Sequence, residues 1–178
     1  MRFTAGEEYG LRCLLRLGRQ GADGSLTIAE ISRAEGISVP YVGKIMRVLR
    51  RGGFVQSTRG KAGGYSLARP ADRILIRDLL DLLGGRLFEP DFCDRHTGGG
   101  DVCTNSVDCS IRSLWRAVQL VVDHVLAKVT LGDLLRNEQT MSSWVGDLVK
   151  LTPGGTNVAA GRDGFQAPAF TPQKSHLN

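Results

Sequence analysis

The chain has few aromatic residues, few prolines and no long apolar run. Of its 178 residues, 6% are aromatic and 6 are proline. Arg12, Arg16 and Arg19 interrupt the apolar segment near the N-terminus, and a membrane span needs about 20 apolar residues in succession. Neither a spanning helix nor a secretory signal is therefore expected. Four cysteines exclude a disulfide-dense secreted module, and the balance of 42% hydrophobic to 23% charged residues is typical of a globular domain.

Positive charge is concentrated in the first part of the chain. Residues 1–69 carry twelve Lys or Arg against five Asp or Glu, and no acidic residue stands between positions 36 and 71. The rest of the chain carries eleven against thirteen, so the net charge of +5 hides an asymmetry. A run of charge is often only a solvated surface, but a basic module is also what binding to the phosphates of DNA requires.

Three helices are predicted near the N-terminus. The first extends from about Thr4 to Arg19, the second covers residues 28–34, and the third covers residues 39–51 after Ser38 as N-cap. The second begins at a capping box, Thr27-Ile-Ala-Glu30, and ends at Gly36. In the third helix, apolar residues at helical spacing predict the buried face: Val42, Ile45, Met46 and Leu49. Two helices joined by a tight glycine turn, the second basic outside, indicate a helix-turn-helix.

Two short strands are predicted directly after the third helix. Residues 54–58 and 64–68 are rich in strand-forming side chains, and the glycines between them permit a hairpin. The predicted tip carries Arg59 and Lys61. A basic hairpin that follows a helix-turn-helix is a winged helix, so the predicted fold class is mainly α with a small β-hairpin wing.

The second half of the chain predicts a long helix after an irregular, cysteine-containing segment. A short helix is expected over residues 74–83, and the long one from Ser110 to about Leu135, with an apolar stripe at spacings of three and four. Such a stripe is covered either by its own domain or by a second copy of the chain, and its length favours the copy. We therefore expect a winged-helix DNA-binding domain (1–85), a cluster-binding loop (86–109), a dimerisation helix (110–137) and an extension that is largely a disordered tail (138–178), although residues 141–150 are undecided.

The cysteines fall into two groups. Cys13 stands among leucines and is expected to be a small buried apolar residue. Cys93, Cys103 and Cys109 form a C-x9-C-x5-C pattern in a glycine-rich segment. An odd number of thiols argues against structural disulfides in a reducing compartment, and three adjacent thiolates repel one another unless they share a cation.

Several chemistries fit three cysteines. With His96 they would make a closed Cys₃His zinc site. Without a metal they could sense oxidants by forming sulfenate or disulfide. An electron-transfer protein is a more remote alternative, because it leaves the basic winged helix without a purpose. No nucleophile–base pattern or Walker motif stands out, so an enzyme is not expected.

These features together resemble the Rrf-type winged-helix transcription regulators, a bacterial family that includes iron–sulfur regulators. The resemblance covers about residues 1–137 and rests on four segments: Met1-Arg-Phe-Thr4, Gly36-Ile-Ser-Val-Pro-Tyr41, Arg59-Gly-Lys-Ala-Gly-Gly-Tyr-Ser-Leu-Ala68 and the cysteines before the long helix. It implies a cytoplasmic, homodimeric repressor that binds an inverted repeat in double-stranded DNA and is switched by a small sensor site.

The resemblance also implies how DNA is bound. The helix 39–51 would enter the major groove with its N-terminal residues nearest the bases, which makes Ser38, Tyr41 and Lys44 candidates for base or nearby phosphate contacts. Arg47 and Arg51 lie farther along and would bind phosphates. In the wing, Arg59 and Lys61 would reach the adjacent minor groove.

For the sensor, the resemblance implies an iron–sulfur cluster, 2Fe–2S in preference to 4Fe–4S, with Cys93, Cys103 and Cys109 as ligands. Some members place a histidine three residues after the last cysteine, where this chain has Arg112, a side chain that cannot ligate. Other members recruit a carboxylate from the first helix of the partner subunit, and Glu8 stands at that position. His96 is the alternative fourth ligand. A change in the cluster caused by redox state, nitric oxide or iron supply would release the loop and Glu8 and so alter DNA affinity.

Overall fold

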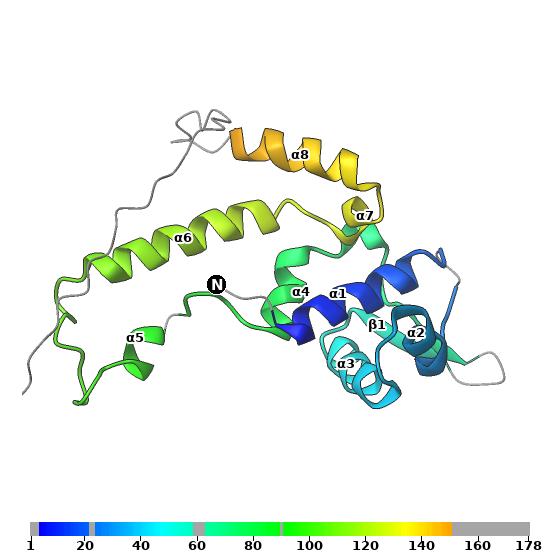
Figure 1. Ribbon diagram of the computed structural model, residues 1–178, viewed down its shortest axis with the longest axis horizontal. Coiled ribbons are helices and arrows are strands. Elements are labelled where there is room, and N and C mark those ends of the chain that lie inside the picture. Colours follow the sequence, from blue (N-terminus) through cyan, green and yellow to red (C-terminus); the bar gives the residue numbers. More distant parts are fainter. Residues whose placement is uncertain (1–3, 22–23, 59–62, 90, 151–178) are drawn as a thin grey trace, which may run out of the picture.

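The computed structural model describes residues 4–21, 24–58, 63–89 and 91–150. A compact bundle containing the N-terminal helices and the hairpin occupies one end of the molecule, and one long helix extends away from it (Figure 1). The elements in chain order are α1 (Ala5–Gly18), α2 (Ile28–Glu35), α3 (Val39–Arg51), β1 (Val55–Thr58), β2 (Gly64–Leu67), η1 (Ala71–Arg73), α4 (Ile76–Leu83), α5 (Phe92–Arg95), α6 (Ser110–Leu126), α7 (Leu131–Leu134) and α8 (Glu138–Lys150). None of the described helices is long and apolar enough to cross a membrane.

Local capping signals explain the bounds of the first helices. Thr4 and Thr27 each close a capping box, with Glu7 and Glu30 respectively, at the starts of α1 and α2. Gly36 ends α2 with a φ of 67°, a left-handed conformation that glycine adopts without strain. The Ser32 hydroxyl donates to the Ile37 carbonyl across the turn at 2.5 Å. These contacts fix the angle between α2 and α3, and the predicted helix-turn-helix is confirmed.

The core of the bundle is apolar and continuous. The predicted inner face of α3 is buried, and it packs with residues from α1, α2, α4 and the end of the hairpin. Fully buried members of this core include Leu14, Leu17, Ile31, Val42, Met46, Leu49, Ile74, Leu79 and Leu131. Burying a side chain of this size contributes about 1.5–3 kcal/mol, so this cluster is the main source of stability of the bundle.

The wing is a two-stranded antiparallel sheet. Val55 pairs with Leu67 and Thr58 with Gly64, as the sequence predicts to within one residue at each outer end. Leu26 adds an isolated bridge to Tyr65, with backbone hydrogen bonds of 2.9 and 2.8 Å. This bridge fastens the wing to the segment before α2, and the predicted fold class is confirmed.

The long helix is shorter than the sequence predicts. α6 ends at Leu126, not near Leu135, so the expected C-terminal boundary was wrong. Val129 instead pairs with the start of α4: the Ile76 N–H donates to its carbonyl at 2.9 Å, and the Leu131 N–H donates to Ile74 at 2.8 Å. Thr130 then caps a new short helix through Asp133. This long-range pairing breaks the helix and returns the chain to the bundle.

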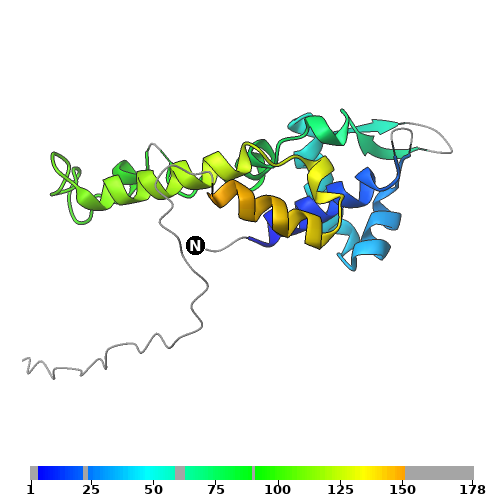
Figure 2. The same ribbon diagram turned by 90° about the horizontal axis from the view of Figure 1, so that it is seen from above.

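The extension after residue 137 begins as a helix. α8 covers Glu138–Lys150, in an extension that the sequence predicted to be largely disordered but with residues 141–150 undecided, and it folds back beside the end of α6 (Figure 2). Met141 and Trp144 are partly buried against the core. The prediction of disorder for residues 151–178 lies outside the described residues.

Cys13 is fully buried in α1, as predicted. Burial raises the pKa of its thiol from 9.0 to about 12, and the carboxylate of Glu35 adds to this effect. The folded chain therefore holds the proton more tightly than the unfolded chain. The stability gained is complete below pH 9 and is lost as the pH rises toward 12. We expect wild type to lose more unfolding free energy than Cys13→Ala between about pH 8 and about pH 10.5, measured by urea unfolding. Equal losses would contradict this assignment.

Candidate functional site

The outer surface of α3 is basic and exposed. Lys44, Arg47, Arg50 and Arg51 are all exposed, opposite the buried apolar face. Ser38 is the N-cap residue, but its side chain makes no capping hydrogen bond, which leaves the hydroxyl free to contact a ligand. A helix whose first turn and one side carry exposed polar and cationic groups can lie in the major groove of DNA.

Tyr41 is half-buried, unlike the other predicted DNA contacts on α3. Its ring packs edge to face against Tyr9 of α1, with 5.7 Å between ring centroids and an interplanar angle of 89°. The guanidinium of Arg12 lies 5.6 Å from the centroid of the same Tyr9 ring. Tyr41 therefore joins the start of α3 to α1.

Arginines brace the helix-turn-helix in a way that the sequence reasoning missed. Arg12 and Arg16 of α1 form ion pairs with Glu35 at the end of α2, at 3.0 and 2.6 Å. Burial tends to raise the pKa of the Glu35 carboxyl, but the hydrogen bonds from Arg16 and Arg12 outweigh it and hold the pKa below its ordinary value. The spacing of Arg12 and Arg16, one helical turn apart, was the available signal.

The wing contacts α3 near the base of the hairpin. The Arg50 guanidinium donates to the Ser57 hydroxyl of β1 at 3.4 Å, and Arg69 lies over the Phe54 ring at 4.9 Å. These contacts orient the hairpin relative to α3. The predicted tip residues Arg59 and Lys61 lie outside the described residues.

The three clustered cysteines come together at the free end of α6. Cys93, Cys103 and Cys109 line one cavity of about 130 Å³. The Cys109 sulfur is the N-cap of α6 and accepts the Arg112 N–H at 3.3 Å, while the Arg112 guanidinium donates to the Ser106 carbonyl at 3.0 Å. A helix N-terminus favours negative charge, as a thiolate ligand requires. Arg112 thus shapes the loop, although it cannot be a ligand.

The thiols share a cavity without forming a closed site. Among the described residues, no group of three or more His, Cys, Asp or Glu side chains is close enough to hold a metal ion. Binding a metal would therefore require the loop to contract around it. Asp94 and Asp101 also line the cavity and were missed by the sequence reasoning. Their nearness to Cys93 and Cys103 in sequence was the only signal.

The two predicted candidates for a fourth ligand lie elsewhere in the chain. Glu8 is exposed in the first turn of α1 and does not line the cysteine cavity. His96 stacks on the Phe92 ring at 4.1 Å, and its Nδ1 lies 2.7 Å from the Phe92 carbonyl oxygen. It is absent from the cavity lining as well. The geometry of one chain therefore brings together the three cysteines, but neither Glu8 nor His96.

One face of α6 is apolar and uncovered. Ile111, Leu114, Val118 and Val121 follow one another at spacings of three and four, and their exposed fractions are 59%, 56%, 37% and 54%. Their spacing places them on one side of the helix. Contiguous exposed apolar surface of this kind is typical of a protein–protein interface.

The helix-turn-helix, the hairpin and the basic surface of α3 define a winged-helix DNA-binding transcription regulator. A family described as “Iron-dependent Transcriptional regulator”, Rrf2, matches residues 3–137. The chain belongs to this Rrf2 family, as its sequence predicted. Residues 138–178, including α8, lie outside the matched region.

Named relatives agree with this assignment. “Protein rrf2” of Nitratidesulfovibrio vulgaris is 34% identical over 137 residues, which cover 77% of this chain and 89% of that protein. “HTH-type transcriptional regulator IscR” of Xenorhabdus nematophila is 28% identical over 141 residues, covering 79% and 83%. The IscR relative is named as a transcriptional regulator, and neither relative is named as an enzyme.

Solved structures show the same fold. The global cysteine regulator CymR of B. subtilis has a TM-score of 0.59 and 25% identity, covering 76% of this chain and 96% of that chain. IscR of T. potens has a TM-score of 0.60 and 28% identity, covering 76% and 86%. The oxidized form of CymR from Staphylococcus aureus has a TM-score of 0.60 and 26% identity, covering 77% and 98%.

Proposed function

We propose that this protein is a homodimeric, cytoplasmic transcription regulator whose affinity for operator DNA is set by an iron–sulfur cluster bound to Cys93, Cys103 and Cys109. The observation that carries the proposal is the shared cavity: three cysteines spread over 17 residues line one space at the end of α6. Thiolates are the usual ligands of iron–sulfur clusters, so the donor set fits. The similarity to IscR proteins supports the same assignment.

DNA would be read by α3 and the wing. Ser38, Tyr41 and Lys44 lie at or near the start of α3 and would be nearest the base edges, with Tyr41 limited to its exposed edge by its packing on Tyr9. Arg47 and Arg51 would bind phosphates. Arg59 and Lys61 of the wing would enter the minor groove.

The dimer would form through the apolar face of α6. Pairing two copies of this face removes four large side chains per chain from water, which favours association. A two-fold symmetric dimer presents two copies of α3, so the operator would be an inverted repeat with half-sites one or two helical turns apart.

DNA affinity would switch with the state of the cluster that the loop cysteines bind. An iron–sulfur cluster, when bound, supplies a centre whose oxidation or loss changes its bonds to the thiolates. Ligated Cys93, Cys103 and Cys109 would hold the loop contracted at the N-terminus of α6. Glu8 of the partner subunit would complete the site and fix the start of α1, and the resulting change in DNA affinity would be typical of allosteric proteins, about 5–150-fold. Asp94 and Asp101, which already line the cavity, and His96 are alternatives to Glu8 as the fourth ligand. Measuring how much iron is retained when each of these four residues is replaced singly identifies the ligand.

The proposal is tested on wild-type protein purified without oxygen. We expect a coloured protein that contains iron and acid-labile sulfide. Its affinity for an operator, selected from random duplexes, should change by about 5–150-fold after iron is removed by a chelator. Colourless protein that contains zinc would show that the cysteines form a structural zinc site and not a cluster site. Colourless, metal-free protein with constant DNA affinity would overturn sensing altogether.

A metal-free thiol sensor is the second candidate. It is favoured by the absence of a closed metal site among the described residues and by the similarity to the oxidized form of CymR. Cys93, Cys103 and Cys109 would then form a disulfide or sulfenate on exposure to oxidant. Metal-free protein whose DNA affinity changes with peroxide and recovers with a thiol reductant would support this alternative.

A further inference from the structure

A short linker, residues 84–89, connects the DNA-binding bundle to the cysteine loop. It begins at Gly84, where the carboxylate of Glu7 lies so close that a side chain at this position would require Glu7 to move. Gly85 follows with a φ of 78°, in the left-handed region that favours glycine. The linker therefore leaves α4 by a turn that packs directly against the first turn of α1.

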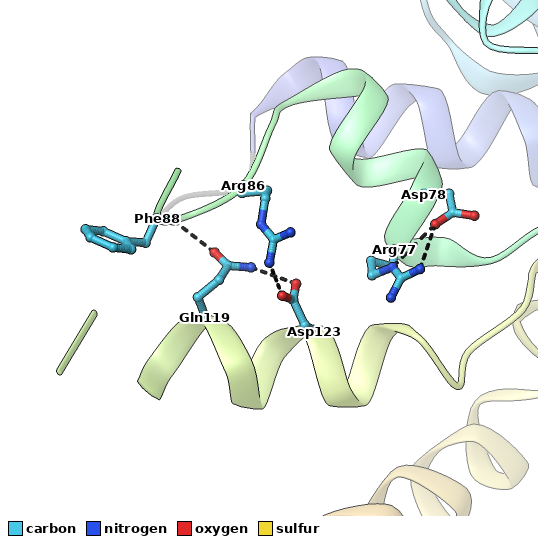
Figure 3. A network of polar contacts seen from close by, with 6 residues as sticks. All are labelled: Arg77, Asp78, Arg86, Phe88, Gln119 and Asp123. Carbon is cyan, nitrogen blue, oxygen red and sulfur yellow. Dashed lines mark hydrogen bonds and ion pairs between the residues drawn. The ribbon is translucent and has the colours of Figure 1, made fainter. Parts of the chain in front are cut away.

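The other end of the linker is fastened to α6 by a polar network, here called the clamp: Arg86, Phe88, Gln119 and Asp123 (Figure 3). The Phe88 N–H donates to Gln119 Oε1 at 2.9 Å, and Gln119 Nε2 donates to Asp123 Oδ1 at 2.8 Å. The Arg86 guanidinium pairs with the other oxygen of Asp123. Both polar atoms of the amide and both carboxylate oxygens are thus used.

Gln119 is the most deeply buried residue of α6, with an exposed fraction of 6%. The contact between α6 and its own linker is therefore organised around an amide, although apolar residues make up much of the helix. A buried amide that loses a partner is left with an unsatisfied polar atom, which is unfavourable, so the clamp fixes the position of the linker more specifically than apolar packing does.

The clamp connects the cysteine loop to both sides of the molecule. Hydrogen bonds attach the loop to α6 on both sides of Cys93 and Cys103 in the sequence: at Phe88 through Gln119, and at Ser106 and Cys109 through Arg112. Toward the bundle, the linker passes Glu7, which closes the capping box of α1. α1 in turn contacts the start of α3 through Tyr9 and Tyr41.

We propose that the clamp is a positioning device that transmits the state of the cysteine loop to α1 and α3 within the same subunit. The proposal rests on the proposed function, since it assumes that this loop is the sensor. Contraction or release of the loop displaces the linker only if Phe88 and Arg86 are held on α6. When they are held, the displacement reaches Glu7 and the first turn of α1. When they are not, the loop changes without consequence for DNA binding.

The test compares Asp123→Asn with Asp78→Asn, which makes the same chemical change in the exposed Arg77–Asp78 pair of α4. For each full-length protein, operator affinity is measured with the cluster reconstituted from iron and sulfide, and again after chelation. We expect the ratio of the two affinities in Asp123→Asn to fall below about one third of the wild-type ratio. In Asp78→Asn the ratio stays at the wild-type value.

A second readout needs neither cluster nor DNA. In metal-free protein, Gln119→Leu should increase the hydrogen-exchange rate of the Phe88 amide at least about tenfold, because its acceptor is removed. Arg86→Met changes an exposed side chain, so it provides a clamp variant whose folding is not at risk. Asp123→Glu keeps the carboxylate and should restore part of the affinity ratio that Asp123→Asn loses. If wild type responds to chelation and the clamp variants respond equally, the inference alone is overturned. If wild type itself does not respond, the proposed sensor fails and the inference with it.

Discussion

Replacing Cys93, Cys103 and Cys109 together by serine leaves a colourless protein that binds operator DNA with the same affinity before and after exposure to oxidant, nitric oxide or an iron chelator. Serine keeps the size of the side chain but does not supply the thiolate that iron–sulfur clusters require. Iron content should fall from stoichiometric to background, and the ratio of affinities should approach one. Iron analysis and DNA-binding titrations provide both measurements.

Cys13→Ser is the matched control for this change. Cys13 is buried in the core and does not line the cysteine cavity. Its replacement should preserve iron binding and regulation while lowering the unfolding free energy by about 1–3 kcal/mol, because a hydroxyl enters an apolar site. Regulation that persists in the triple serine variant would remove the cysteine loop from the mechanism.

The winged helix was predictable from sequence because its boundaries depend on local signals. The capping box at Thr27 and the glycine at position 36 act within a single turn, and both appear in the structure where the sequence predicts them. The inner face of α3 follows from periodicity alone. For these elements, propensity, capping and burial all favour the same structure.

The end of α6 could not be predicted in the same way. Its apolar periodicity continues past Leu126, but the Val129 carbonyl accepts a hydrogen bond from Ile76 at the start of α4, more than fifty residues earlier in the chain. A tertiary contact of this kind overrides local helix propensity. The capping box of Thr130 and Asp133 was the local sign that a new helix begins.

The candidate site was predictable only in part. The sequence identifies the three cysteines, but their spacing, C-x9-C-x5-C, does not show that they line one cavity. The polar clamp had no sequence signal, because Gln119 interrupts an apolar helix at a position that resembles a solvent-facing one. Its role depends on where the linker lies, which only the structure provides.

Replacing Leu114 and Val121 together by glutamate should convert the proposed dimer into a monomer. Both side chains are more than half exposed on the apolar face of α6, and charge on both surfaces of a symmetric interface is repelled by its copy. A monomer contacts one half-site only, so affinity for the inverted repeat should fall by about 10²–10⁴-fold. Sedimentation measures the oligomeric state, and titration of the full operator and of a single half-site measures the affinities.

The matched control is Leu120→Glu. Leu120 is 69% exposed on the same helix, and at 100° per residue it points away from the apolar face that contains Leu114 and Val121. This variant should remain a dimer and bind the full operator as wild type does. A double variant that stays dimeric would show that the subunit interface does not lie on this face. A monomeric double variant that kept full operator affinity would instead show that dimerisation does not contribute to DNA binding, because the two copies of α3 would then not need to be held together.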